Sequence, residues 1–377
     1  MLEYNYIIIL INTIKKRLQL IFKEISYGIF KLLYGSVERI ETNSENIEII
    51  NSIFENHLNY KIYLVKNSRI YTDTINDTAI IKDNKIVKGA SFQIRNSKFE
   101  EVQKNIVFSK GTPRIIKKLN GTIFSLLTGG GGNFNYLHWL LDVLPRIKIL
   151  ENSYDLDKID YFLFPNLEKR FQKETLDILQ IPSEKRLSSI LFRHISADQI
   201  ISTEHPYVIN NDASNELQNL PDWILNWLRN SFLKNNTSIS SHYPKKIFID
   251  RSDATSNHSE FRKIINEKQI IEQLKLNGYK AVRLSDLSFK EQIKTFYNAN
   301  KIIGLHGAGF ANLIFCKPNT EILEIKPSGE GKLYENLAKK FELNYQSLSK
   351  IPEKYNFNNQ LGHLSISYQE IKNIFKI

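Results

Sequence analysis

The second half of the chain alternates short apolar runs with amphipathic stretches, and this alternation restricts the fold more than any other feature of the sequence. The runs KIFID, YKAVRL, KIIGLHG and EILEIKP are typical of buried strands, and the segments between them carry apolar residues at helical spacing. Strands that alternate with helices form a parallel sheet covered by helices. Residues 240–360 are therefore predicted to form a Rossmann-like domain of the α/β class, followed by a last helix at 364–377.

Residues typical of helix ends support this interpretation of the second half. Gly278 follows an amphipathic stretch and is expected to end a helix, because glycine adopts the left-handed conformation found there. Ser285 or Ser288 is expected to cap the next helix, because a serine side chain accepts a hydrogen bond from the first turn.

The first half shows the same alternation less regularly. Short strands are expected between residues 60 and 127, including a hairpin that turns at Asp83-Asn84. The segment GGGGNFNYLHWLLDVLPRIKILEN then predicts a glycine loop that runs into a helix, and strands and helices alternate onward. The polar stretch KNNTSISSHYP at 234–244 is typical of a linker between domains, so residues 46–236 are expected to form a second Rossmann-like domain.

Length and composition fit two globular domains. The chain has 377 residues, of which 42% are hydrophobic and 24% are charged. Its net charge of +11 comes from scattered basic residues without a nucleic-acid-binding motif, so we expect an anionic small molecule or membrane surface rather than nucleic acid. Cys316 is the single cysteine, which excludes an intrachain disulfide and favours a reducing, cytoplasmic location.

Residues 1–45 are predicted to form a separate helical segment. Its apolar run is interrupted at Lys15, Lys16 and Arg17, and it is shorter than the roughly 20 residues that span a bilayer. No small-residue cleavage site of a signal peptide follows it. Two alternatives remain: the helix packs on its own protein, or it lies as a basic amphipathic helix on the inner face of a membrane.

A histidine and two glycines follow one predicted strand. In open α/β sheets, ligands bind beyond the carboxyl ends of strands, where His306, Gly307 and Gly309 are expected. Glycines let the backbone approach a phosphate, and the next helix begins with unbonded N–H groups. His306 and Asn312 can add side-chain donors. The alternative is a structural turn whose histidine only bonds a backbone carbonyl.

Two more strand ends carry charged residues. Arg251 follows the strand KIFID, and an arginine fork can bind two phosphate oxygens at once. Glu324 lies near the end of EILEIKP, the strand that follows the histidine and glycines, where a carboxylate can accept both ribose hydroxyls or remain solvated. Taken together with the histidine and glycines, these residues predict a site for a nucleotide diphosphate.

An acid/base pair is predicted in the first half. If a helix starts at Asn133, then His138 and Asp142 are four residues apart on one face, with Asn135 one turn earlier. An imidazole and a carboxylate beside a glycine loop can transfer a proton. The alternative is an amphipathic helix on which both side chains are merely solvated.

Other motifs are weaker or missing. The sequence has no G-x-S-x-G elbow, no G-x-x-x-x-G-K-[ST] loop and no zinc-ligand spacing. Asp155 and Asp157 form an Asp-x-Asp pair that can hold a metal-bound nucleotide sugar, although it precedes a strand instead of following one.

Four segments in order resemble glycosyltransferase family 61: GNFNYLHWLLDVLPR, DRSDATS with FRKIINE, LSFKEQIKTFYNANKIIGLHGAGFANLIF, and EILEIKP. The family includes plant xylan-modifying transferases, animal O-linked GlcNAc transferases and bacterial capsule-type proteins. The insertion TSNHSE departs from its pattern and puts the role of Arg262 in doubt. The resemblance places donor-side residues at Arg251, His306, Gly307, Ala308, Gly309, Asn312 and Glu324, and catalytic residues at His138 and Asp142. Asn135, Arg262 and Lys326 are secondary candidates.

The resemblance implies a GT-B-like architecture, with two Rossmann-like domains facing across a cleft and the last helix packing back on the first domain. It also implies inverting transfer from a nucleotide sugar to a glycan or lipid-linked glycan, without an obligatory metal and in surface polysaccharide synthesis. Asp142 is the expected base, with His138. Two alternatives stay open: an inactive nucleotide- or sugar-binding protein of this fold, and a metal-dependent GT-A-type transferase that uses Asp155 and Asp157.

Overall fold

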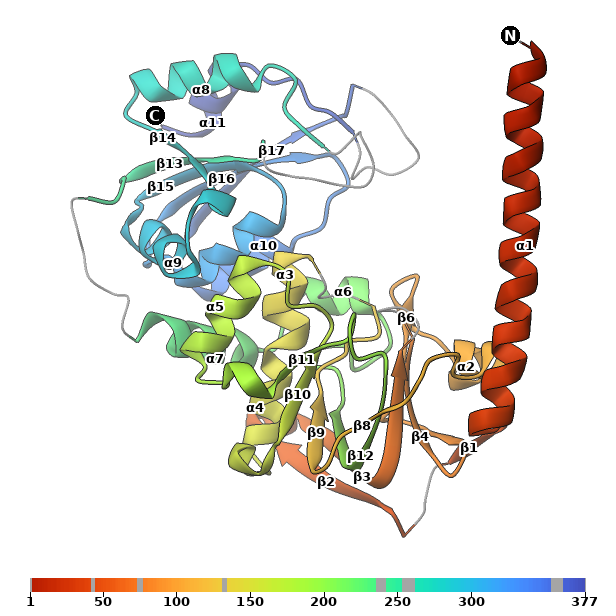
Figure 1. Ribbon diagram of the computed structural model, residues 1–377. Helices are drawn as coiled ribbons and strands as arrows, with labels where there is room; N and C mark the ends of the chain where they lie inside the picture. The colour runs from red at the N-terminus through yellow and green to blue at the C-terminus, as the bar shows by residue number, and fades with distance from the viewer. Residues whose placement is uncertain are drawn as a thin grey trace. The chain divides into compact units, whose positions relative to one another are not determined.

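The chain folds into two compact units that are interleaved along the sequence (Figure 1). The computed structural model describes residues 2–41, 45–72, 77–130, 134–234, 242–252, 262–353 and 362–376. Unit 1 comprises residues 1–131, 146–166 and 185–205, and unit 2 comprises residues 132–145, 167–184 and 206–377. This division differs from the contiguous domains 46–236 and 240–360 that were expected. Asn133, the TSNHSE insertion and most of the polar join lie outside the described residues.

Unit 1 is built on a ten-stranded mixed sheet. β3 pairs antiparallel with β2, β4 and β12, whereas β9 pairs parallel with β10 and β12. The α/β class is confirmed, but this half is not the mainly parallel sheet of a Rossmann-like domain, because hairpins join neighbouring strands. The strands are β1 (Arg39–Glu41), β2 (Ile47–Ile53), β3 (Asn59–Thr72), β4 (Thr78–Lys82), β5 (Lys85–Val87), β8 (Lys117–Lys118), β9 (Thr122–Ser125), β10 (Tyr161–Phe164), β11 (Arg186–Ser188) and β12 (His194–Thr203).

The hairpin between β4 and β5 is confirmed. Asp83 and Asn84 have φ angles of 48° and 57°, which are the left-handed values that a two-residue hairpin turn requires. β12 was not predicted, because polar residues interrupt the apolar pattern of HISADQIIST. Its long antiparallel pairing with β3 stabilises a strand that its own sequence indicates only weakly.

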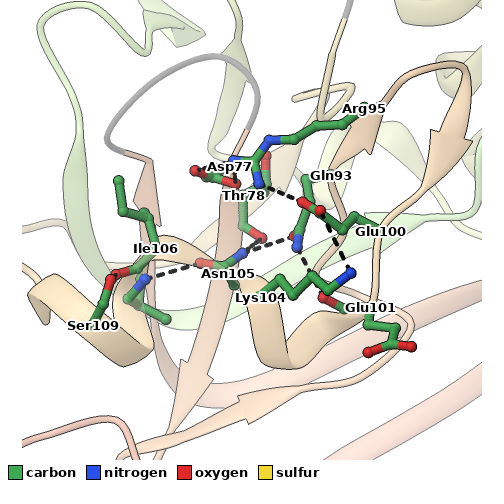
Figure 2. A network of polar contacts seen from close by, with 11 residues as sticks. Asp77, Thr78, Gln93, Arg95, Glu100, Glu101, Lys104, Asn105, Ile106 and Ser109 are labelled. Atoms are coloured by element: carbon green, nitrogen blue, oxygen red, sulfur yellow. Dashed lines mark hydrogen bonds and ion pairs between the residues drawn. The ribbon is translucent and has the colours of Figure 1, made fainter.

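A polar network ties three elements of unit 1 together (Figure 2). Nη2 of Arg95 lies 2.7 and 2.8 Å from the two carboxylate oxygens of buried Asp77. The Asn105 amide donates to Gln93 at 3.0 Å and to the Thr78 carbonyl at 3.2 Å. These contacts fix the start of β4, the small hairpin β6 (Ile94–Arg95) with β7 (Lys98–Phe99), and α2 (Ile106–Lys110).

The buried Arg146 stabilises unit 1 where α4 (Pro145–Glu151) begins. Its guanidinium donates to the Thr203 hydroxyl at 2.9 Å, to the Ser202 hydroxyl at 3.2 Å and to the Leu127 carbonyl at 2.5 Å. Burial lowers the pKa of Arg146 to about 9. Neutral oxygens therefore take the place of a counter-ion for this cation.

Helix α1 (Leu2–Tyr34) belongs to unit 1 and contacts it near its C-terminal end. Lys31 donates to the Ser109 carbonyl at 3.2 Å, and the Tyr34 ring packs edge-on against His194. The remainder of the helix extends away from the sheet of its unit (Figure 1). Within the described ranges, no helix combines the length and the apolar character needed to cross a bilayer.

Unit 2 contains a five-stranded parallel sheet in the order β14-β13-β15-β16-β17. The parallel sheet predicted for the second half is confirmed, although β17 was not predicted. The chain reverses its direction of progress across the sheet between β13 and β15, and ligands of open α/β sheets bind at such a switch point. The strands are β13 (Lys246–Asp250), β14 (Lys280–Arg283), β15 (Lys301–Leu305), β16 (Glu321–Pro327) and β17 (Asn344–Lys350).

Helices cover the sheet of unit 2 (Figure 1). α8 starts later than predicted, Gly278 follows it with φ 79°, and Ser288 caps α9 with Glu291 in a capping box. Ile371 of α11 and Phe375, which directly follows the helix, lie in the core of this unit. The last helix therefore packs on the second unit, whereas packing on the first was expected. The helices of unit 2 include α5 (Arg170–Ile178), α6 (Ala213–Gln218), α7 (Asp222–Leu233), α8 (Glu267–Leu276), α9 (Phe289–Asn298), α10 (Leu333–Lys340) and α11 (Tyr368–Ile374).

The helical segment after the glycine loop belongs to unit 2. It consists of α3 (Tyr136–His138), followed by a π-helical turn, η3 (Trp139–Val143). The Tyr136 ring packs against Phe171 of α5 and Phe289 of α9, with centroid distances of 5.1 and 6.3 Å. This aromatic packing places His138 and Asp142 in the same unit as the parallel sheet.

Candidate active site

Arg251 and His306 meet at the switch point of the parallel sheet. Arg251 directly follows β13 and His306 directly follows β15, and these two strands are neighbours. Nη1 of Arg251 donates a hydrogen bond to the backbone carbonyl of His306. The sequence predicted both residues at strand ends, and the structure brings them together where this class of sheet binds ligands.

The glycines of the HGAG segment make room for neighbouring side chains. A Cβ atom on Gly307 would lie 2.7 Å from Cζ of Arg251, and one on Gly309 would lie 2.7 Å from Leu284. The Gly307 carbonyl accepts a hydrogen bond of 2.7 Å from the Tyr334 hydroxyl. Ala308 begins η7 (Ala308–Phe315), a 3₁₀-helix at the place where a helix was expected. Gly307 therefore permits the close approach of the Arg251 guanidinium to the loop.

Glu324 holds the His306 ring. One carboxylate oxygen contacts Nδ1 of His306, and the other accepts a hydrogen bond from Tyr345. Glu324 lies within β16 beside Gly304, and only 1% of its surface is exposed. The structure thus differs from the expected ribose contact: both oxygens already have protein partners, and burial removes them from the surface.

A buried ion pair continues from His306. Glu330 lies 3.5 Å from Nε2 of His306 and 2.8 Å from Nη2 of Arg262. In the part of the chain that the structure describes, Nε and Nη1 of Arg262 are buried without a hydrogen-bond partner. Burial lowers the pKa of Arg262, while the negative charge of Glu330 opposes that shift. Two guanidinium nitrogens of Arg262 thus lack a hydrogen-bond partner among the described residues beside the switch point.

Lys326 adds a third cation near these residues. Its ammonium lies 3.3 Å from the Gly331 carbonyl and 3.9 Å from Glu324. Its side chain is largely buried, and the cation is held by the loop between β16 and α10. The secondary candidates Arg262 and Lys326 therefore lie close to the predicted donor residues.

The predicted pair His138 and Asp142 is brought together. Nδ1 of His138 lies 2.9 Å from one Asp142 oxygen, and the other oxygen accepts a hydrogen bond of 2.9 Å from Tyr207. The negative charge of Asp142 raises the pKa of His138 against the opposing effect of burial. Burial, followed by the charge of Asp142, raises the pKa of Tyr207, so the phenol stays protonated as a donor.

Asp142 and His138 differ in exposure. The Asp142 side chain is 5% exposed, whereas 32% of the His138 side chain is exposed. The alternative in which both are solvated therefore does not hold for Asp142. The pair lies around a π-helical turn, a local distortion that is frequent at functional sites.

Asn135 and Asn312 have structural contacts. The Asn135 side chain caps α3 by accepting hydrogen bonds from the backbone of Leu137 and His138 at 3.0 and 3.4 Å. Asn312 is fully buried, accepts a 2.7 Å hydrogen bond from Tyr136, and donates to the Gly309 carbonyl at 3.1 Å. Instead of presenting an amide to a ligand, Asn312 connects η7 to α3.

The Asp-x-Asp pair lies in unit 1. Asp155 caps the short 3₁₀-helix η4 (Leu156–Lys158) by accepting a hydrogen bond of 3.0 Å from the backbone of Asp157. Among the described residues, no group of three or more His, Cys, Asp or Glu side chains is arranged to hold a metal ion. The local structure therefore explains Asp155 as a helix cap.

Several residues of the site were not predicted. Glu330, Tyr207 and Tyr345 lie in segments without a recognisable motif, and each contacts a predicted residue only through tertiary structure. The sequence SGEGK around Glu330 has the wrong spacing for a phosphate loop. Its place three residues after β16 of the parallel sheet is the signal that could have identified it.

Comparison with known proteins matches the same part of the chain. The family model for glycosyltransferase 61 matches residues 136–323, which include His138, Asp142, Arg251 and His306 but end before Glu324.

Three animal relatives are each described as "EGF domain-specific O-linked N-acetylglucosamine transferase". The Rattus norvegicus protein is 30% identical over 131 residues, covering 33% of this chain and 24% of the relative. For Mus musculus the identity is 30% over 110 residues (28% and 20%), and for Xenopus laevis it is 29% over 97 residues (24% and 18%). The matched part of the chain thus spans about a fifth of the length of these relatives. On the family match over residues 136–323, the chain belongs to glycosyltransferase family 61.

Proposed function

We propose that the chain is an inverting glycosyltransferase that moves a sugar from a nucleotide-sugar donor to a hydroxyl group of a glycan acceptor. The observation that carries the proposal is the contact between Arg251 and His306 at the switch point of a parallel sheet, in a chain of glycosyltransferase family 61. Switch points of parallel sheets bind nucleotides, and a glycosyltransferase needs a sugar donor, so a nucleotide diphosphate is the ligand consistent with both.

The donor diphosphate is proposed to bind beside Arg251, Arg262 and Lys326. Arginine binds phosphate oxygens in pairs, and Nε and Nη1 of Arg262 are buried donors without a partner among the described residues. Gly307, Ala308 and Gly309 supply backbone next to these cations, and His306, oriented by Glu324, adds a ring nitrogen. Asn312 is assigned a supporting role through Tyr136.

His138 is proposed to take the acceptor proton, with Asp142 as its positioning residue. This assignment departs from the expectation that Asp142 is the base, because the Asp142 carboxylate is buried and bonded on both oxygens. A carboxylate that accepts the Nδ1 proton leaves the Nε2 lone pair of a neutral imidazole to act as the base. Tyr207 fixes the carboxylate from its other side.

The reaction follows as a single displacement. The acceptor oxygen attacks the anomeric carbon and loses its proton to His138, while the bond from that carbon to the phosphate oxygen breaks. The nucleoside diphosphate leaves with the electron pair, and the configuration inverts. Arg251 and the neighbouring cations stabilise the charge that develops on the leaving group, which is where electrostatic catalysis acts most strongly. On this basis we propose that no metal is obligatory, so transfer should persist in EDTA.

The relatives suggest which substrates to test first. Their printed names describe transfer of N-acetylglucosamine, so a nucleotide-linked N-acetylglucosamine is the first donor to test. We propose a glycan or lipid-linked glycan as acceptor and surface polysaccharide synthesis as the role. A cytoplasmic location and a two-domain GT-B arrangement remain predictions.

The test separates binding from transfer. Calorimetry with a panel of nucleoside diphosphates should give a clear affinity for one nucleotide, and a ligand at a hundredfold its dissociation constant stabilises the fold by about 2.7 kcal/mol. Arg251→Ala should weaken that affinity, whereas Asp142→Asn should keep the affinity and slow transfer by about 10²–10⁴-fold. Arg170→Ala, an exposed arginine of α5 paired with Glu174, is the control and should change neither. Unaltered nucleotide affinity in Arg251→Ala would contradict the proposed site.

Two alternatives predict other results. An inactive binding protein would bind the nucleotide but neither transfer the sugar nor slowly hydrolyse the donor when acceptor is absent. A metal-dependent GT-A-type enzyme would lose activity in EDTA and in Asp155→Asn. Asp155→Asn should leave transfer unchanged if the site in unit 2 is correct.

A further inference from the structure

The N-terminal helix α1 presents a continuous apolar stripe that faces away from its own unit. Apolar residues recur at spacings of three and four along the helix, which places them on one side of it. Each side chain of this stripe is between 49% and 89% exposed. We call this stripe the outer face; it consists of Ile11, Ile14, Leu18, Ile21, Phe22, Ile25, Ile29, Leu32 and Leu33.

The opposite side of the helix is the one that contacts unit 1. Tyr27, Phe30, Lys31 and Tyr34 are partly buried, and Arg69 donates to the Tyr34 carbonyl at 3.3 Å. The first alternative, in which the apolar face of this helix packs on the protein itself, is therefore not observed among the described residues. Apolar patches larger than a few hundred Å² are uncommon on soluble proteins and mark interaction surfaces.

The charge of α1 indicates what covers the outer face. The helix carries five Lys or Arg residues and two Glu residues, a net charge of +3. Lys15, Lys16, Arg17 and Lys23 are all exposed. At 100° per residue, Lys15 and Arg17 lie on the two borders of the outer face. Long basic side chains at such borders can reach lipid headgroups while the apolar face lies among the acyl chains.

A second copy of the helix fits this pattern less well. The outer face contains a heptad seam, but the charged residues that flank the seam are the three cations Lys15, Arg17 and Lys31 with Glu24 as the one acid, so two copies would have few opposite charges to pair across it. Coiled coils use charges at these positions to select their partner. Gly28 also interrupts the seam, while Phe22, which is 73% exposed, lies outside it. The apolar surface is therefore broader than a coiled-coil seam.

We propose that α1 docks unit 1 on an anionic lipid bilayer, with the outer face in the headgroup and acyl boundary. The helix would lie in the plane of the interface, as amphipathic helices with a basic border do. This inference does not rest on the proposed transferase activity, because unit 1 and its helix lie outside the residues of the candidate site.

Vesicle flotation of the full-length protein tests the proposal. The protein should float with phosphatidylcholine vesicles in which a third of the lipid is phosphatidylglycerol, should not float with phosphatidylcholine alone, and should dissociate at high salt. Lys15→Glu with Lys16→Glu and Arg17→Glu should weaken binding by roughly fivefold or more for each charge. Equal binding to both vesicle types would overturn the charge argument, and no binding to either would overturn the proposal.

Variants of the outer face supply the matched comparison. Leu18→Ser with Phe22→Ser should abolish flotation. Ile115→Ser with Leu191→Ser, which removes apolar side chains that are 76% and 68% exposed elsewhere in unit 1, should leave it unchanged. If the control pair abolishes flotation as well, binding is not specific to α1 and the proposal fails.

Site-directed labelling decides between lipid and self-association. Cys316 is fully buried, so an environment-sensitive fluorophore can be attached selectively to Phe22→Cys on the outer face or to Lys16→Cys on the polar side. Anionic vesicles should shift the emission of the label at position 22 to shorter wavelength and leave that at position 16 unchanged. A shift without vesicles that grows with protein concentration, together with a dimer in light scattering, would assign the outer face to a second copy instead.

Discussion

The Tyr136 hydroxyl donates a 2.7 Å hydrogen bond to the side-chain oxygen of Asn312, which joins the two predicted motifs of the chain within one unit. Tyr136 lies two residues before His138, and Asn312 lies in the 3₁₀-helix that begins after His306 and Gly307. The proposed base and the proposed diphosphate site are thus built on the same scaffold. Their relative position depends on this contact and on the aromatic packing around it.

Tyr136→Phe is expected to destabilise unit 2. The change leaves the buried oxygen of Asn312 without its donor, which costs about 1–3 kcal/mol of unfolding free energy. Urea denaturation measures the loss. Asn312→Ala and the double variant complete a cycle, in which the double variant should cost less than the sum of the single changes. Additive costs would show that the two side chains do not depend on one another.

The pH dependence of transfer should follow His138. Because Asp142 raises its pKa above the usual 6.5, the neutral ring that can accept a proton forms only above that raised value. The rate should therefore rise with pH and level off. Asp142→Asn removes the charge that raises the pKa, so the midpoint should move to lower pH while the plateau falls by about 10²–10⁴-fold. His57→Gln, at an exposed position in unit 1, should leave the profile unchanged.

The same pair contributes to stability with the opposite pH dependence. Protonated His138 is favoured in the folded state, so its stabilisation is complete below the unfolded pKa of 6.5 and disappears as pH rises through the raised folded pKa. The difference in unfolding free energy between the wild type and Asp142→Asn should shrink over that interval. A difference that does not change with pH would show that the ion pair is not formed in solution.

Glu330→Gln is expected to raise the affinity for a nucleoside diphosphate. The Glu330 carboxylate lies between Arg262 and His306, where it offsets the positive charge of Arg262 that a diphosphate would bind. Its removal should increase affinity by about tenfold, and should also destabilise the free protein because Arg262 is left as a buried, unpaired cation. Calorimetry and thermal unfolding with and without nucleotide measure the two effects.

Glu335→Gln is the matched control for this change. Glu335 is a nearby residue of α10 that is paired at the surface with Lys339. The control should alter neither the affinity nor the stability by a measurable amount, because exposed ion pairs contribute little. A Glu330→Gln variant with weaker nucleotide binding would instead show that the carboxylate contacts the donor directly.

Gly307→Ala should weaken nucleotide binding through Arg251. The new Cβ would lie 2.7 Å from Cζ of Arg251, and it would displace the guanidinium without straining the backbone, since the φ of 166° is an extended conformation. We expect about a tenfold loss of affinity with little loss of stability. When Arg251→Ala is already present, Gly307→Ala should have almost no further effect on affinity. Gly28→Ala, where nothing lies near the added methyl group, is the control.

The sequence predicted the parts of the site that depend on local pattern. Strand ends place Arg251 and His306, and helical spacing places His138 beside Asp142. The sequence did not predict that Tyr345 and Tyr207 would donate hydrogen bonds to the carboxylates of Glu324 and Asp142. Glu324 was expected to face a ribose, but alternation along a fully buried strand does not indicate which side chain lies across the sheet. The hydrogen bond from Tyr345 to Glu324 depends on β17, a strand that the sequence pattern did not predict.

The domain boundary was mispredicted for a related reason. A polar stretch near residue 240 separates two segments in which apolar strands alternate with helices, and this pattern suggests a linear division of the chain. The structure instead assigns residues 132–145, 167–184 and 206–234 to the second unit. The reason is the packing of aromatic side chains such as Tyr136, Phe171 and Phe289, which lie far apart in the sequence.

The interleaving of the two units restricts how this protein can be dissected. A fragment that starts at the polar join would keep the parallel sheet but lose Tyr136, Phe171 and Phe232, and their removal would leave Phe289 and Phe315 exposed to water. The complementary fragment would carry those aromatic side chains without the surface they cover. Neither fragment would fold as it does in the intact polypeptide. Truncated variants for crystallisation or ligand screening should therefore remove only α1 and keep the rest of the chain.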